Sequence, residues 1–256
     1  MFIDEEKCTG CGNCVYYCPA NAIKIQKTSK GKKAVIDYDE CVECGLCERM
    51  MNRDVDDVIL RREICPTKAF YSTNLAYPRI IRQIFSDPTR VKKETGVFGR
   101  GTEEVKTIDV THRISKSEIA FNIELGRPGI GTRLREINKM SQAVATVGVK
   151  FAEDNPLTML MVDKNKGNLQ DEVLGEKVLS AIIEFVVTPD KVANLLNTIF
   201  HTNVETVFVV GTFSLIQENG RPLGDAYIKN AGYELSENGK VNIGLGRRIE
   251  EEMINQ

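Results

Sequence analysis

Residues 8–19 read Cys8-Thr-Gly-Cys11-Gly-Asn-Cys14-Val-Tyr-Tyr-Cys18-Pro19, and a second run, Cys41-Val-Glu-Cys44-Gly-Leu-Cys47, repeats the two-residue gaps. The second run is completed at a distance by Cys65-Pro66. Together the runs contain all eight cysteines of the 256-residue chain. Two-residue gaps let three thiolates of one short loop converge on one face of a cubane cluster, so the pattern predicts two [4Fe–4S] clusters.

Eight cysteines also fit a disulfide scaffold or two structural zinc sites. Disulfides are disfavoured because we see no export signal, and because the spacing, with a proline after the fourth cysteine, is not a generic one. Zinc sites use pairs of cysteines separated by roughly 12 to 20 residues, not three in one tight run. The iron–sulfur interpretation is therefore favoured.

The two cysteine runs form an internal repeat. Aligning Cys8 with Cys41 pairs Gly12 with Gly45, and the two Cys-Pro dipeptides align in the same way. In these motifs residues 1–75 resemble the bacterial-type two-cluster ferredoxins, in which each half supplies three ligands to its own cluster and one to its neighbour. The resemblance implies one cluster on Cys8, Cys11, Cys14 and Cys65, and a second on Cys41, Cys44, Cys47 and Cys18.

One segment departs from the repeat. Seventeen residues separate Cys47 from Cys65, against three between Cys14 and Cys18. The inserted segment, 48–64, is charged and has apolar residues at a loosely helical spacing. It is predicted to be either a loop or short helix that covers one cluster, or a docking element for a redox partner.

Length and charge limit the remaining possibilities. A chain of 256 residues is too long for a ferredoxin alone, so we expect a cluster domain at 1–75, a Gly- and Pro-containing connector at 76–117, and a further domain at 118–256. No apolar stretch approaches the roughly 20 residues of a membrane span. The net charge of −2 gives no field for nucleic acid. Thiolate clusters and no export signal predict a cytoplasmic protein.

The charge of the cluster domain predicts the charge of its partner's docking face. Residues 1–75 hold 11 Lys/Arg and 12 Asp/Glu, and thiolate-ligated clusters make this segment more negative. A redox partner protein with a basic docking face is therefore expected.

Residues 118–256 alternate between strand and helix patterns. Strands are predicted at 118–125, 156–162, 181–187 and 205–216, with helices at 132–147 and 188–200 and a short helix at 173–179. Thr188-Pro189-Asp190 is typical of a helix start. The order β-α-β-β-α-β predicts an α+β domain of the split βαβ type, with a loose resemblance in element order to ACT-type sensing domains.

The C-terminal end is predicted to add a hairpin. Residues 227–235 and 240–245 flank the turn Ser236-Glu-Asn-Gly239, and 247–254 suggests a short helix. The open sheet edges of such a domain make homo-oligomerisation plausible.

A candidate anion site follows the first predicted strand of this domain. Residues 126–133, Gly-Arg-Pro-Gly-Ile-Gly-Thr-Arg, join a strand to a helix start, where backbone N–H groups favour an anion. The residues in question are Arg127, Gly129, Gly131 and Arg133. The stretch also reads as a plain Gly/Pro turn, because it lacks both the P-loop ending and the dinucleotide-binding glycine order.

The leading hypothesis is an electron-transfer protein with two [4Fe–4S] clusters that serves a dedicated oxidoreductase, using the C-terminal domain for docking. The alternative is an electron-transfer subunit of an enzyme whose C-terminal domain binds an anionic small molecule as substrate or regulator. Neither histidine lies in a recognisable catalytic pattern and all cysteines are used by the clusters, so no catalytic residue is predicted, and an electron carrier or redox-enzyme subunit is favoured over an enzyme acting alone.

Overall fold

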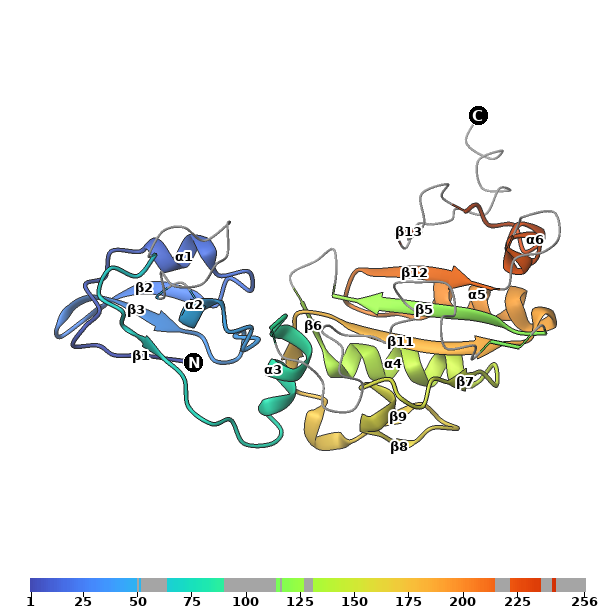
Figure 1. Cartoon of the computed structure of the whole chain (residues 1–256), viewed down its shortest axis with the longest axis horizontal. Coiled ribbons are helices and arrows are strands. Elements are labelled where there is room, and N and C mark those ends of the chain that lie inside the picture. The colour runs from blue at the N-terminus through green and yellow to red at the C-terminus, as the bar shows by residue number, and fades with distance from the viewer. Residues whose placement is uncertain are drawn as a thin grey trace.

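The computed structural model describes residues 1–49, 51, 64–89, 114–115, 117–126, 131–214, 222–235 and 241–242. The described residues form two main groups of buried side chains, a smaller one formed by residues up to Phe70 and a larger one that begins at Ile81, and a third, minor group of Ala20, Ala22 and Val42. In Figure 1 the two bodies lie side by side, with helix α3 (Ile80–Ser86) between them. Helices and strands are mixed throughout, in agreement with the predicted α+β content.

The N-terminal body consists of two short sheets and two short helices. Strands β1 (Phe2–Ile3) and β4 (Phe70–Tyr71) pair antiparallel, as do β2 (Ile23–Thr28) and β3 (Gly31–Ile36). Each cysteine run turns into a short helix, α1 (Asn13–Tyr17) in the first half and α2 (Leu46–Arg49) in the second. Pairing of β1 with β4 returns the chain to its start, which brings the second Cys-Pro dipeptide back to the first cysteine run.

The C-terminal body is built on a five-stranded antiparallel sheet with the order β13-β12-β5-β11-β7. Strands β5 (Ile119–Leu125) and β11 (Ala181–Val187) pair along their whole length at its centre. Beside them lie β12 (Phe208–Phe213), β13 (Val241–Asn242) and β7 (Lys150–Phe151). Helices α4 (Leu134–Ala145) and α5 (Val192–His201) pack on one face of the sheet, where every second strand residue joins their apolar side chains in the larger core.

Smaller elements surround this sheet. Two-stranded ribbons are formed by β6 (Thr132–Arg133) with β10 (Lys177–Val178), and by β8 (Met161–Asp163) with β9 (Asn168–Leu169). Single 3-10 turns occur at Thr158–Leu160, Asp171–Val173 and Pro189–Lys191, and helix α6 covers Leu223–Asn230. Among the described residues, no helix combines the length and apolar character needed to cross a bilayer.

The central strands and both long helices lie where the sequence pattern places them, but the second predicted strand is wrong. A 3-10 turn occupies much of 156–162, and the strand that pairs with β11 is the two-residue β7. Asn155 explains the difference: its side chain donates to the Ile182 carbonyl at 3.1 Å and accepts from the Leu157 N–H at 2.8 Å, which turns the chain out of the sheet. The short helix expected at 173–179 is likewise replaced, by a 3-10 turn and β10.

The predicted C-terminal hairpin is also wrong in its first arm, because residues 223–230 are helical. Pro222 precedes the helix, Asp225 lies in its first turn, and Gly232, with φ +83°, ends it. Tyr233 then stacks on Phe200 of α5 with ring centroids 4.8 Å apart, so the apolar residues that suggested a strand face the helical layer instead. Strand β13 pairs with β12; the predicted turn at 236–239 and helix at 247–254 lie outside the described residues.

The predicted connector contains α3. Ile81 and Phe85 of this helix are 5% and 2% exposed and belong to the larger core. Residues 90–113 of the connector and 52–63 of the insertion lie outside the described residues. At the edge of the insertion, Met51 is buried in the smaller core, where its sulfur accepts a hydrogen bond from the Phe70 N–H at 3.2 Å.

Candidate metal centres

Four cysteines from both ends of the N-terminal body line one cavity: Cys8, Cys11, Cys14 and Cys65. The loop that carries the first two needs glycine, because Gly10 has φ +69° and a Cβ there would lie 2.1 Å from the Lys32 carbonyl oxygen. This close approach packs the loop on the β2–β3 hairpin. The hairpin in turn contacts the first cysteine, since the Ala34 N–H donates to Cys8 Sγ at 3.4 Å and Lys33 Nζ donates to the Cys8 carbonyl at 2.6 Å.

The other four cysteines line a second cavity: Cys18, Cys41, Cys44 and Cys47. Gly45 in this loop repeats the conformation of its counterpart Gly12, with φ +71° against +83°. Glu43 occupies the position that corresponds to Gly10 and also has a positive φ, of 54°. The structure thus keeps the backbone of the first loop in the second although the residue differs, which reflects the internal repeat.

In both Cys-Pro segments the same backbone arrangement holds the cysteine sulfur in place. Asn21 and Lys68, each three residues after the cysteine, both have left-handed backbones, with φ of 51° and 50°. The next amide therefore turns back on the thiol, so that Ala22 N–H donates to Cys18 Sγ at 3.2 Å and Ala69 N–H to Cys65 Sγ at 3.3 Å. Amide hydrogen bonds to sulfur stabilise thiolates and help to set cluster potentials.

The electrostatics of the thiols reflect their crowding in a protein interior. Burial raises the pKa of Cys14 from the usual 9.0 to about 11, and the neighbouring Cys11 adds to the effect. Burial also raises the pKa of Cys47, with contributions from Cys44 and Cys18. Metal ligation requires thiolates, so cluster assembly must displace these protons.

The donor sets fit iron–sulfur clusters. All eight cysteines are free of disulfides. Among the described residues, no three His, Cys, Asp or Glu side chains gather as they would around a single metal ion; the thiols instead surround two cavities. Four thiols around a space, with amides directed at the sulfurs, are the arrangement that a multi-iron cluster needs.

The two centres differ in their surroundings. Cys11 of the first centre is the exposed cysteine, whereas those of the second are partly buried. Leu179 of the C-terminal body packs against a small apolar group beside the second centre, formed by Ala20, Ala22 and Val42. The second centre therefore lies at the junction of the two bodies.

Basic side chains from residues 79–177 meet acidic ones of the N-terminal body at this junction. Arg79 pairs with Glu43 at 2.6 Å, and Arg133 pairs with Asp39 at 2.6 Å. Lys177 pairs with Glu40, which also contacts Arg133 at 3.3 Å. A basic docking face was expected on a separate partner; one is present within the chain itself.

The predicted anion site is only partly described. Gly131 has φ +87° beside the Val178 carbonyl, and Arg133 is engaged by carboxylates of the N-terminal body and by the Gly175 carbonyl. Arg127 and Gly129 lie outside the described residues. Arg133 therefore links the C-terminal body to the N-terminal body, and anion binding by Arg127, Gly129 and Gly131 stays a prediction.

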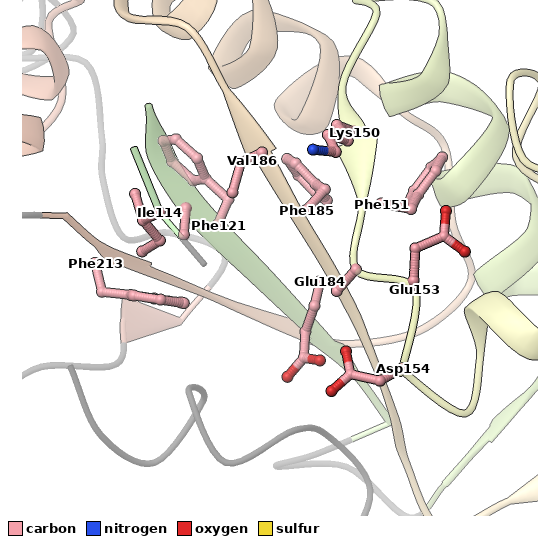
Figure 2. A pocket seen from close by; sticks show the side chains of 12 residues that line it. Ile114, Phe121, Lys150, Phe151, Glu153, Asp154, Glu184, Phe185, Val186 and Phe213 are labelled. Atoms are coloured by element: carbon pink, nitrogen blue, oxygen red, sulfur yellow. The ribbon is translucent and has the colours of Figure 1, made fainter. Parts of the chain in front are cut away.

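A third cavity, of about 350 Å³, lies on the C-terminal body away from the predicted anion site. Figure 2 shows its apolar side chains together with Glu153, Asp154 and Glu184, while Lys150 is its basic lining residue. Glu153 is paired with Lys164, but the three carboxylates still outnumber the two ammonium groups of Lys150 and Lys164, which makes this cavity a poor place for an anion.

Comparison with known proteins bears on the N-terminal body. The sequence profile of the 4Fe-4S dicluster domain matches residues 7–50, which include seven of the eight cysteines. The chain is 35% identical over 68 residues to the pyruvate synthase subunit PorD of Methanothermobacter marburgensis, covering 27% of this chain and 58% of that protein. It is 32% identical over 68 residues to an uncharacterised ferredoxin of Methanocaldococcus jannaschii, covering 27% of this chain and 84% of that protein.

A third relative is larger. One of the subunits of the H(2):CoB-CoM heterodisulfide,ferredoxin reductase of M. marburgensis is 36% identical over an alignment of 66 residues that covers 20% of this chain and 10% of that protein. No solved structure matches the chain. Through its N-terminal segment the chain belongs to the 4Fe–4S dicluster ferredoxin family, and it carries two [4Fe–4S] clusters. The family match includes no residue of the C-terminal body.

Sequence reasoning missed the residues that orient the sulfurs. The small residue four positions after each Cys-Pro cysteine, Ala22 and Ala69, is visible in the repeat alignment and could have indicated a close backbone approach. Arg79 and Arg82 gave no such signal, because they lie in a segment without a strong pattern.

Proposed function

We propose that this protein is a low-potential electron carrier that delivers or accepts single electrons for a dedicated cytoplasmic oxidoreductase. The observation that carries the proposal is the pair of four-thiol cavities in one repeat, one with an exposed cysteine and one beside the C-terminal body. When bound there, each cluster supplies reversible one-electron transfer. The protein's own residues hold the sulfurs, shield them and set the charge around them.

The ligand sets are part of this proposal. Cys8, Cys11, Cys14 and Cys65 would hold the first cluster, and Cys18, Cys41, Cys44 and Cys47 the second. The support is that each set lines its own cavity. Cys65→Ala and Cys11→Ala should remove the same EPR signal and leave the other; a Cys65→Ala protein that loses the signal lost by Cys44→Ala would refute the assignment.

We also propose that residues 118–256 form a split βαβ domain, after a connector at 76–117. The sheet order β12-β5-β11-β7 and two helices on one face support this architecture. Self-association through the sheet edges remains a prediction; the edge strands β7 and β13 have only two residues each, which leaves a short template for pairing. Light scattering after size exclusion would decide it.

The relatives suggest the kind of partner. One belongs to a pyruvate synthase and another to a heterodisulfide reductase, so we propose a multi-subunit oxidoreductase that needs a low-potential donor or acceptor. The C-terminal domain would provide docking to it. An excess of a small two-cluster ferredoxin should then fail to displace the full chain from its oxidoreductase; complete displacement would show that docking uses the ferredoxin surface alone.

The low potential is tested with two reductants. Dithionite should reduce both clusters anaerobically, whereas ascorbate should reduce neither. Reduction by ascorbate would place the clusters outside the low-potential class.

The alternative function is an electron-transfer component of an enzyme whose C-terminal domain binds an anionic small molecule. The cavity of Figure 2 is the site for a small molecule that the described residues provide, but its carboxylates do not favour an anion. A rise in the thermal unfolding temperature with phosphate or carboxylic acids would support this alternative.

A further inference from the structure

Arg82 connects α3 to the backbone of the second cysteine loop. It is 5% exposed, and its Nη1 donates to the carbonyls of Tyr38 at 3.0 Å, Asp39 at 2.9 Å and Cys41 at 2.8 Å. Its Nε pairs with Glu176 of the C-terminal body. A guanidinium from outside the cysteine repeat thus binds the segment that ends in a cysteine of the second centre.

A second arginine of the same region fixes the next part of the loop. Arg79 donates to Glu43 Oε1 from Nη2 and Nε, at 2.6 and 2.9 Å, and from Nη1 to the Tyr38 carbonyl at 3.0 Å. Glu43 is 5% exposed and also accepts from the N-terminal ammonium of Met1 at 2.8 Å. Because the Glu43 carboxylate contacts two cations, Arg79 and the N-terminal ammonium, its negative charge beside the second centre is compensated.

The charged groups that contact the second centre's ligand loop, together with their ion-pair partners, therefore sum to a net positive charge. Arg49 also donates to a ligand carbonyl, that of Cys44, at 2.7 Å, and pairs with Asp87. With Arg82, Arg79 and the N-terminal ammonium it makes four cations, against three carboxylates: Glu43, Glu176 and Asp87. Arg82 and Glu43 are buried and Arg79 and Glu176 are partly buried, so these charges interact more strongly than they would in water.

The first centre has a different environment. Its cavity is lined, among the described residues, by residues between Ile3 and Phe70, and Lys33 of β3 contacts its ligand loop by donating to the Cys8 carbonyl at 2.6 Å. The two centres therefore differ not in their linings, which the N-terminal body provides for both, but in the charged groups that contact their ligand loops: Arg82, paired with Glu176, contacts the loop of the second centre.

We propose that Arg82 is a positioning residue that raises the reduction potential of the second cluster relative to the first, and that Glu176 moderates its effect. One-electron reduction adds a negative charge to the cluster, and a buried cation hydrogen-bonded to a ligand's carbonyl stabilises that added charge. The C-terminal body thereby sets which of the two centres holds the electron. This inference rests on the proposed function, since it requires both clusters.

The test is an anaerobic redox titration of the full-length protein followed by EPR, with the two signals assigned by their loss in Cys11→Ala and Cys44→Ala. Arg82→Gln should lower the potential of the second cluster, and Glu176→Gln should raise it. We expect each to change the reduction equilibrium by roughly tenfold, which corresponds to about 59 mV for one electron. Lys33→Gln is the matched control, because it should lower the potential of the first cluster only.

Opposite shifts at the second cluster, with the first unchanged, would support the proposal, since a merely structural role gives no reason for opposite signs. Unshifted potentials, or shifts of the same sign, in variants with full iron would overturn it. If Arg82→Gln loses iron, Glu176→Gln decides, because it leaves every contact of Arg82 with the cysteine loop in place. A wild-type protein without iron would instead contradict the proposed function.

Discussion

Gly10→Ala should release the iron of the first centre while Gly12→Ala should not, although the two glycines lie in one loop. Both have left-handed backbones, with φ of +69° and +83°, so an alanine costs about 1 to 2 kcal/mol in strain at either position. Only at Gly10 would the new Cβ meet backbone, 2.1 Å from the Lys32 carbonyl; at Gly12 the nearest atom is Ile25 Cγ1 at 3.8 Å. Overpacking of this kind costs about 1 to 3 kcal/mol more.

The steric overlap at Gly10 would also disturb the first metal centre. Moving the hairpin away from Gly10 shifts Ala34 and Lys33, which donate to the sulfur and the carbonyl of Cys8. The extra 1 to 3 kcal/mol corresponds to roughly five- to 150-fold faster loss of iron from the first centre to a chelator. Anaerobic chelation followed by absorbance, with EPR to identify the centre, measures it. Equal rates for the two variants would refute the steric argument.

Three further substitutions test the C-terminal body. Phe85→Ala empties a site that is 2% exposed in the larger core, so about 3 to 5 kcal/mol of stability should be lost by denaturant unfolding; a loss below about 1 kcal/mol would mean that α3 is not anchored there. Gly211→Ala would place a Cβ 2.7 Å from the buried Asn122 amide, and we expect a cost of about 1 to 3 kcal/mol, which Asn122→Ala should relieve. Burial alone would raise the pKa of Glu136, but hydrogen bonds from Lys139 and the Glu205 N–H hold it below the usual 4.5. Its stabilising effect is therefore present above pH 4.5 and is lost as the pH falls through the lowered value, so the stability difference between wild type and Glu136→Gln should vanish in acid; a difference that persists there would contradict this.

The metal centres could be predicted from sequence because their signal is local. Cysteine spacing fixes which thiols share a loop, and the repeat carried over to backbone geometry even at Glu43, where the residue type gives no hint of a left-handed conformation. Central strands such as Ile119–Leu125 were also predictable, because their apolar side chains are buried against the helices.

What the sequence did not reveal depends on contacts between distant segments. The hydrogen bonds of Asn155 with Ile182 and Leu157 turn the chain out of the sheet, and the ring of Tyr233 stacks on that of Phe200. In both places these tertiary contacts override the local propensity for a strand. The contact of Arg82 with the second cysteine loop joins residues 41 positions apart. Neither periodicity nor motif spacing carries information on such pairs.

The most direct test of the central claim is anaerobic iron and sulfide analysis of the full-length protein, combined with EPR after dithionite reduction. We expect about eight iron per chain, four in each cluster, and a spectrum of two interacting [4Fe–4S] clusters. About four iron, or zinc in place of iron, would contradict the claim.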